Sequence, residues 1–374
     1  MTEAPQDQWR AQDYVFVRKA IDLLWKERKE MVHTPIFRMN LPARLDIEFI
    51  FKDESKSRTK NLKHRFAWAL FMWALVEGKI KSRDTIVYEA SSGNTAISEA
   101  YLARLIGLNF VAVVPEGTEE AKINRIKRYG GQVITVPKDT VKRAQQEAAE
   151  NNGFFMNQFA NAEKALDFYE IGTGGTITSV GRYIKRYGLK TKVVLVDPQF
   201  SVLYDYAIRN KFANETSEHY SRGPGMAGTG FGGPAITGYT TSLQPSVIHR
   251  AIKLPDLGSI AAMHVLKALG IEGGTSTGMN FLAVLSLVAK QPPAVPNQRV
   301  RVISLLSDSS ELYIDTYFNR TWVDDGFKNL GGWAVLTCWR KVIERSYRTG
   351  TDPLSVGADK CMPDSTVIKF ENIN

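Results

Sequence analysis

Two patterns of hydrophobic and polar positions alternate along the chain. Short apolar runs are followed by longer stretches in which apolar residues recur every three or four positions. Short runs of this kind are typical of strands buried in a parallel sheet, and the longer stretches are typical of amphipathic helices. We expect strands at 45–51, 85–89, 109–115, 132–136, 153–159, 192–197 and 300–306. We expect helices at 13–31, 62–77, 96–106, 119–129, 140–151 and 181–187.

The alternation of short strands with helices predicts an α/β fold, in which helices cover both faces of a parallel sheet. A chain of 374 residues with 44% hydrophobic content can build two lobes. No apolar run resembles a membrane span. The first residues are acidic and have no apolar signal core, so we expect a cytoplasmic protein, with a mitochondrial location left open.

The cysteines and histidines give no sign of a disulfide framework or a metal site. Cys338 and Cys361 are the two cysteines, and they suit a reducing compartment. The five histidines and two cysteines show no metal-ligand spacing. We therefore expect neither a disulfide framework nor a bound metal.

The chain is basic, with a net charge of +9 and an isoelectric point near 9.3. Its basic residues are spread along helices such as 121–128, and aromatic residues do not interleave with them. This distribution favours a solvated basic surface, with attraction of an anionic cofactor or partner as the alternative. It does not predict a nucleic-acid platform.

The first segment with candidate chemistry is the run of small polar residues from Ser91 to Thr95. It lies between a predicted strand and a predicted helix. The N–H groups in the first turn of a helix have no partners within the helix, so they can bind an anion. A plain polar turn is the alternative.

The second segment is Gly172–Thr176, which precedes a predicted helix. Its three glycines let backbone N–H groups approach a phosphate closely, and its two threonines can donate hydrogen bonds. No Gly-Lys-Ser/Thr follows, and the spacing differs from that of the dinucleotide fingerprint. The alternative is a plain glycine-rich turn.

The third segment is the lysine-rich stretch 51–68. Most of its lysines are typical of a solvated turn, but Lys63 stands at a helix start beside apolar residues. Such surroundings favour the neutral amine, which can form a Schiff base. A reactive lysine, a phosphate loop and a polar turn together suit pyridoxal 5'-phosphate.

These segments resemble three motifs of the fold-type II pyridoxal-phosphate enzymes, in the cysteine synthase and cystathionine β-synthase family. The motifs, within a similarity from about 33 to 327, are Lys52-x-Glu54 with Lys63-x-Arg65-x-Ala67, Ser91-Ser-Gly-Asn-Thr95, and Gly172-Thr-Gly-Gly-Thr176. The resemblance implies a tryptophan synthase β-like fold and a homodimer. It also implies two lobes, each with a mostly parallel sheet flanked by helices. The larger, cofactor-binding lobe would comprise 1–50 and 165–374, and the smaller, substrate-loop lobe 51–164.

The resemblance also implies a role for individual residues. Lys63 would bond the cofactor and move the substrate's α-proton, and Asn94 would bind the ring hydroxyl. Ser309 would face the ring nitrogen, where a neutral hydroxyl favours expulsion of a β-substituent. Further cofactor contacts would come from Gly172, Thr173, Gly174, Gly175, Thr176, Gly228 and Gly230. The substrate carboxylate would be held by Ser91, Ser92, Gly93, Thr95 and Gln158.

Three departures from the family pattern stand out. Asn61 replaces the serine that the family has two positions before its lysine. The stretches Gly274–Gly278 and Glu311–Tyr313 resemble the cysteine desulfhydrase-like branch. Between Phe159 and Gly172 the chain is shorter than the family by a few tens of residues, which predicts a weaker phosphate site and reduced activity.

The resemblance implies pyridoxal-phosphate dependent β-elimination or β-replacement on cysteine- or serine-type amino acids, as in a lyase or transferase of sulfur amino-acid metabolism. Two alternatives are a serine or threonine dehydratase and a catalytically weak binding or sensor protein with the same fold.

Overall fold

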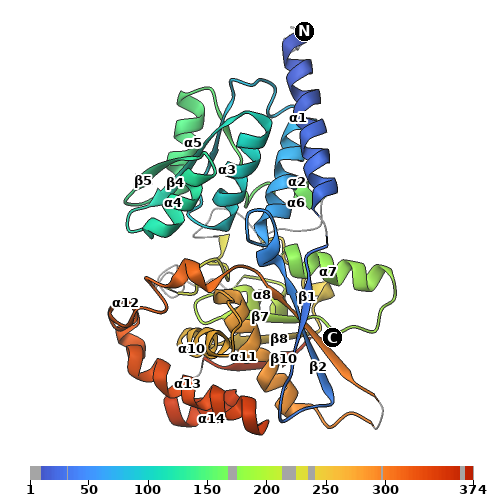
Figure 1. Ribbon diagram of the computed structural model, residues 1–374, viewed down its shortest axis with the longest axis vertical. Helices are drawn as coiled ribbons and strands as arrows, with labels where there is room; N and C mark the ends of the chain where they lie inside the picture. The colour runs from blue at the N-terminus through green and yellow to red at the C-terminus, as the bar shows by residue number, and fades with distance from the viewer. Residues whose placement is uncertain are drawn as a thin grey trace. The chain divides into compact units, whose positions relative to one another are not determined.

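The computed structural model describes residues 10–31, 33–166, 175–212, 225–234, 241–295, 298–362 and 367–373. They fall into two compact units (Figure 1). The first unit comprises Met1–His33 and Lys63–Gly175, and the second comprises Thr34–Leu62 and Thr176–Asn374.

The first unit is built on one sheet with the strand order β5-β4-β3-β6, in which every pair is parallel. Its strands are β3 (Ile86–Glu89), β4 (Asn109–Pro115), β5 (Gln132–Val136) and β6 (Phe154–Phe155). Its helices are α1 (Ala11–Glu30), α2 (Lys63–Val76), α3 (Asn94–Ile106), α4 (Glu120–Arg128), α5 (Thr140–Glu150) and α6 (Ala162–Leu166). The predicted alternation of strands and helices is confirmed here, although β6 covers only part of the strand expected at 153–159.

Helix α1 belongs to the first unit because its inner face is bonded to α2 and α3. The Trp68 indole N–H donates to the Leu24 carbonyl at 2.6 Å. The Glu27 carboxylate lies 3.1 Å from His64 Nε2 and accepts from the Tyr101 hydroxyl at 3.0 Å. The lobes expected from the sequence, 1–50 with 165–374 and 51–164, are therefore divided differently in the structure. Residues up to His33 go with the first unit, and 34–62 go with the second.

The second unit contains two three-stranded sheets, with the orders β1-β2-β9 and β10-β8-β7. Their strands are β1 (Ile36–Met39), β2 (Ile47–Asp53), β7 (Val194–Pro198), β8 (Arg250–Leu254), β9 (Val300–Leu306) and β10 (Lys369–Asn372). Each sheet has one parallel pair, β2 with β9 or β7 with β8, and one antiparallel edge strand. Parallel sheets flanked by helices confirm the α/β class. The single mostly parallel sheet expected in this lobe is replaced by two mixed ones among the described residues.

Helices and short 3-10 turns cover these two sheets. The helices are α7 (Gly175–Arg186), α8 (Leu203–Arg209), α10 (Asp256–Ala268), α11 (Thr275–Lys290), α12 (Arg320–Gly326), α13 (Gly332–Thr349) and α14 (Pro353–Cys361). The 3-10 turns are η1 (Glu54–Lys56), η2 (Pro245–Val247), η3 (Ser310–Tyr313) and η4 (Lys328–Leu330). Helix α11 contacts β7, β8 and β9, so one helix packs against strands of both sheets. The largest apolar core of this unit centres on α10, α11 and α13.

One expectation about the cysteines is wrong, because Cys338 on α13 and Cys361 at the end of α14 form a disulfide. Helices α13 and α14 pack against each other and bring the two Cα atoms to 5.7 Å. The separation of 23 residues gave no sign of this contact, which depends on the turn between two helices. None of the helices among the described residues is long and apolar enough to cross a membrane.

Candidate active site

The small-residue turn of the first unit connects β3 to α3 and leaves open space beside Gly93. The Gly93 N–H donates to Ser91 Oγ at 3.3 Å, and Gly93 is the residue before the first turn of α3. Gly93 has an ordinary φ of −108°, and a Cβ added there would meet no atom within 4 Å. Ser91, Ser92 and Asn94 are partly exposed around it. The turn therefore has room for a ligand at a helix N-terminus.

Two of the predicted substrate residues are hydrogen-bonded to each other. The buried Thr95 hydroxyl donates to Gln158 Oε1 at 2.8 Å, across 63 positions of sequence. The Gln158 N–H donates to Glu89 Oε2 at 3.0 Å. Because β6 pairs with β3, the chain beyond β6 passes the carboxyl end of β3, where the turn begins. The structure thus joins the turn to Gln158 and adds Glu89, which the sequence analysis missed.

Glu89 and Glu99 are both fully buried, and each has an upshifted pKa. Burial raises the pKa of Glu89 to about 7, partly offset by hydrogen bonds from the Gln158 and Ala90 N–H groups. Burial, together with the nearby charge of Glu89, raises the pKa of Glu99 well above its ordinary value. The sequence did contain a sign of this pair, because Glu89 ends an apolar strand and Glu99 interrupts the apolar face of a helix.

Lys63 is the first residue of α2. Its amine is surrounded by protein although the residue as a whole is partly exposed, and this desolvation lowers the pKa of Lys63 to about 8. Its Nζ lies 5.6 Å from the centre of the Phe66 ring. A lysine that holds an appreciable neutral fraction near neutral pH fits covalent attachment of an aldehyde cofactor. Asn61, the departure from the family pattern, is buried and donates to the Thr59 carbonyl at 2.9 Å.

The predicted phosphate loop is only partly described. Gly172, Thr173 and Gly174 lie outside the described residues, as does the short strand considered at 167–171. Gly175 and Thr176 are the first residues of α7, which begins earlier than the expected start at Gly181. The Thr178 hydroxyl, one turn inside, donates to the Ser242 carbonyl at 3.0 Å and accepts from the Gln244 N–H at 3.0 Å.

In the second unit, Gly228 and Gly230 lie in one turn, and the backbone conformation of this turn favours glycine at both positions. Each has a φ of +75°, which favours glycine. A Cβ on Gly230 would come within 2.8 Å of Ser201 and 2.9 Å of Pro198, whereas one on Gly228 would meet nothing within 4 Å. The Phe231 N–H donates to Ser201 Oγ at 2.9 Å and fixes the end of this turn.

Two side chains that the sequence analysis did not single out brace the same turn. The Ala227 N–H donates to Tyr317 Oη at 2.7 Å, and the Tyr317 hydroxyl donates to the Gly225 carbonyl at 2.8 Å. The Thr275 hydroxyl donates to the Ala227 carbonyl at 2.8 Å. Thr275 belongs to the stretch Gly274–Gly278, so the motif that indicated the desulfhydrase-like branch was the available signal.

Ser309 stands at the start of η3, beside that stretch. Its Oγ accepts from the Glu311 N–H at 3.3 Å, and the Gly274 N–H donates to the Asp308 carbonyl at 3.2 Å. A Cβ on Gly274 would lie 2.0 Å from Asp308 Oδ1, so only glycine allows this approach. The structure thus links Ser309 to the Gly228–Gly230 turn through Gly274 and Thr275.

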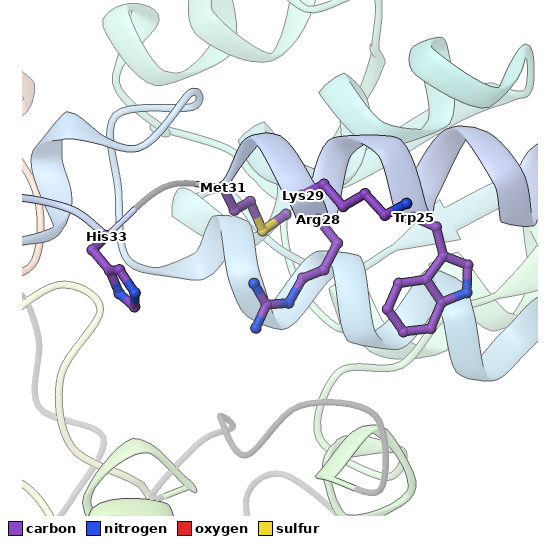
Figure 2. A pocket seen from close by; sticks show the side chains of 5 residues that line it. All are labelled: Trp25, Arg28, Lys29, Met31 and His33. Atoms are coloured by element: carbon purple, nitrogen blue, oxygen red, sulfur yellow. The ribbon is translucent and has the colours of Figure 1, made fainter.

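A separate cavity of about 500 Å³ lies at the end of α1 (Figure 2). Its lining consists of Trp25, Arg28, Lys29, Met31 and His33. None of the residues predicted from the sequence lines it. The C-terminal end of a helix disfavours anions, so these basic side chains do not by themselves make a phosphate site.

Comparisons with known proteins give the chain its family. A family model described as pyridoxal-phosphate dependent enzyme matches residues 29–170. A Caenorhabditis elegans protein described as pyridoxal-phosphate dependent is 40% identical, over 91% of this chain and 88% of that protein. The L-cysteine desulfhydrase of Mycobacterium tuberculosis is 34% identical, over 88% of this chain and 94% of that enzyme.

Solved structures agree on the fold. An O-ureido-L-serine synthase superposes with a TM-score of 0.62 at 23% identity, covering 79% of this chain and 93% of that one. A hydrogen sulfide-producing enzyme from Fusobacterium nucleatum gives a TM-score of 0.61 at 23% identity, covering 79% and 98%.

The alignments also measure a length difference. The alignment with the nematode protein has 384 positions but spans 91% of 374 residues, about 340, so about 44 positions have no residue in this chain. The alignment with the mycobacterial enzyme has 365 positions and spans 88% of this chain, about 329 residues. About 36 of its positions therefore have no residue in this chain. Sequence, fold and the desolvated amine of Lys63 agree: the chain belongs to the fold-type II pyridoxal-phosphate dependent enzymes, the family of the cysteine desulfhydrases, cysteine synthases and cystathionine β-synthases.

Proposed function

We propose that this protein catalyses pyridoxal-phosphate dependent β-elimination or β-replacement on cysteine- or serine-type amino acids. The observation that carries the proposal is the desolvated amine of Lys63, with a pKa of about 8, in a chain of this family. Relatives described as a cysteine desulfhydrase and a cysteine synthase support the substrate class. When bound, the cofactor supplies an electron sink for the bonds around the substrate's α-carbon.

The residues of the first unit would bind the substrate and move its proton. Lys63 would attach the cofactor and, as a neutral amine, take the α-proton. Asn94 would hold the ring hydroxyl. The carboxylate would be held at the open turn by Ser91, Ser92, Gly93, Thr95 and Gln158. The hydrogen bond from Thr95 to Gln158 supports this assignment, because it fixes two of these side chains before a ligand arrives.

The residues of the second unit would orient the cofactor. The neutral hydroxyl of Ser309 would face the ring nitrogen and favour prompt expulsion of a β-substituent. The backbone at Gly228 and Gly230 would approach the ring closely. The phosphate would be held by Gly172, Thr173, Gly174, Gly175 and Thr176, and the position of Gly175 and Thr176 at the start of α7 supports this part.

Product analysis tests the reaction. With cysteine we expect sulfide, pyruvate and ammonia, or a thioether when a second thiol is supplied, and with O-acetylserine and a thiol we expect replacement. Formation of 2-oxobutyrate from threonine without sulfide from cysteine would favour the dehydratase. A purified protein that binds the cofactor but turns over none of these amino acids would favour the binding protein.

Borohydride reduction and peptide mapping test the lysine. We expect the cofactor label on Lys63, and we expect Lys63→Ala to lose the label and the activity. Lys56→Ala is the matched control, because Lys56 is an exposed lysine of the same segment. A label on Lys56 or Lys60 instead would overturn the assignment.

We also propose that the short junction between Phe159 and Gly172 weakens cofactor binding and lowers activity. Among the described residues, β9 pairs only with β2 and β7 only with β8, so two parallel strands of this unit each have an unpaired edge. The family match ends at residue 170, and the alignments leave about 36 to 44 positions without a residue somewhere along this chain. A phosphate loop without a strand to fix it loses preorganisation.

Insertion of a family-length helix and strand after Glu170 tests this second proposal. We expect the cofactor to bind more tightly and sulfide release to increase. If the affinity for the cofactor is unchanged and the fold is otherwise intact, the short junction does not weaken cofactor binding.

Two further expectations complete the proposal, a homodimer and a cytoplasmic location. The family resemblance supports the first. The second is carried over from the sequence analysis as a proposal. Light scattering of the purified holoenzyme and fractionation of cells would test them.

A further inference from the structure

Two buried carboxyl groups lie directly behind the turn that we propose to hold the substrate carboxylate. Glu89 is the last residue of β3, and Glu99 follows Thr95 on α3 by four positions, which places both on one face of the helix. Both residues are 0% exposed. A chain of hydrogen bonds runs from the Thr95 hydroxyl to the Gln158 side chain and from the Gln158 N–H to Glu89.

Most of the oxygens of this pair lack a hydrogen-bond partner among the described residues. Oε1 of Glu89 and both carboxyl oxygens of Glu99 are buried and unpaired. A buried, unpaired carboxylate is costly, so such a group keeps its proton or shares one. A protonated carboxyl beside a carboxylate can donate to it, and this arrangement would satisfy oxygens of both groups.

Several charged groups on the neighbouring elements have partners other than Glu89 and Glu99. From α1 and α2, Glu27 lies 3.1 Å from His64. On α4, Lys122 contacts Glu119 at 2.9 Å. On α5, Arg143 contacts Glu147 at 2.6 Å. Further cations on these helices include Lys63 and Arg65 on α2, Arg104 on α3, Arg125, Lys127 and Arg128 on α4, and Lys142 on α5. No cation figures among the causes that shift either carboxyl's pKa.

We propose that Glu89 and Glu99 form a proton-holding pair whose charge sets the affinity of the Ser91–Thr95 turn for a substrate carboxylate. The inference rests on the proposed carboxylate role of this turn. Glu89 and Glu99 are positioning residues: Glu89 acts through the Gln158 N–H, and both act through their field. Loss of one proton to water changes the pair from neutral to singly negative.

The direction of the effect follows from the sign of that charge. Below about pH 7 the pair is neutral, since burial raises the pKa of Glu89 to about 7 and that of Glu99 further. Above that pH, one negative charge appears behind the turn and repels the bound carboxylate. Through partly polar protein this repulsion corresponds to about a fivefold to tenfold loss of affinity.

The test measures competitive inhibition of the holoenzyme by propionate, whose own carboxylate stays ionised between pH 6 and 8.5. In the wild type we expect the inhibition constant to rise about fivefold to tenfold over this range. In Glu89→Gln we expect it to stay flat. In Glu99→Gln we expect the midpoint to stay near pH 7, because the protonated Glu99 carries no charge and the glutamine amide can donate to the Glu89 carboxylate in its place. Glu150→Gln, an exposed acid of the same unit, is the control and should follow the wild type.

A second measurement does not depend on the variants being active. Infrared difference spectra between pH 6 and 8.5 should show the loss of a protonated carboxyl band in the wild type, absent from Glu89→Gln. A pH-independent inhibition constant, or a Glu89→Gln profile equal to that of the wild type, overturns the pair's role. A wild type that binds no propionate at any pH overturns instead the proposed role of the turn.

Discussion

The two units hold their candidate residues by different means. In the first unit the turn before α3 follows a strand of one continuous, fully parallel sheet, and Gln158 follows its neighbour β6. In the second unit the Gly228–Gly230 turn is held by side chains, the hydroxyls of Tyr317, Thr275 and Ser201. The backbone hydrogen bonds of a sheet fix the loops that follow its strands. A turn held by side-chain hydrogen bonds depends instead on individual side chains and close contacts. The second unit should therefore be the more sensitive to small substitutions.

The largest expected effect contrasts glycines of the two turns. Gly230→Ala should lower the free energy of unfolding by about 4 kcal/mol, because the new Cβ would strain a left-handed backbone and crowd Ser201 and Pro198. Gly93→Ala should cost less than about 1 kcal/mol, because its backbone is ordinary and its surroundings are open. Urea unfolding measures both.

Gly228→Ala is the matched control for this contrast. It shares the φ of +75° but has no neighbour within 4 Å, so about 1 to 2 kcal/mol is expected. If Gly230→Ala costs no more than Gly228→Ala, crowding does not hold the turn and the comparison between the units loses this support.

The disulfide provides the next test, since it stabilises the second unit alone. Reduction of Cys338–Cys361 should cost about 3 kcal/mol, the scale expected for a loop closed over 23 positions. Hydrogen exchange should show faster opening of α13 and α14, with β3 and α3 unchanged. The double variant Cys338→Ser/Cys361→Ser should behave as the reduced protein does. If reduction of the disulfide speeds hydrogen exchange equally in both units, the two units unfold together.

How far the sequence determined these features differs between the units. Strands and helices of the first unit follow from apolar periodicity, because a strand such as β4 is buried on both faces and helices such as α4 and α5 are buried on one. The Thr95–Gln158 contact came only from a family resemblance, since it spans 63 positions. The bracing by Tyr317 and the Cys338–Cys361 bond could not be predicted, because they depend on tertiary packing between helices and turns rather than on local pattern.

The pH dependence of stability tests the first unit. The pKa of Glu89 is raised from 4.5 to about 7 on folding, so folding favours its protonated form. Its contribution to stability is fully present below pH 4.5 and is lost as the pH rises through 7. The loss amounts to up to about 3 kcal/mol at about 1.4 kcal/mol per pKa unit. Chemical unfolding of the wild type and Glu89→Gln between pH 4.5 and 8 measures it. Glu99 adds a slope of the same sign that survives in Glu89→Gln, so this variant should lose only part of the slope. An unchanged slope in Glu89→Gln would place the titrating group elsewhere.

The smallest effect concerns the Thr95–Gln158 hydrogen bond, which distinguishes positioning from folding. Thr95→Val keeps the shape of the side chain but leaves the buried Gln158 Oε1 without its donor, which should cost about 1 to 2 kcal/mol. Thr95→Ser keeps the hydroxyl and should cost less than about 1 kcal/mol, for one lost methyl group. If the sheet already fixes the turn, both variants should fold, yet propionate should bind Thr95→Val about tenfold more weakly and Thr95→Ser almost normally. Failure of Thr95→Val to fold would instead mean that this side chain, and not the parallel sheet, holds the turn, and the contrast between the two units would then disappear.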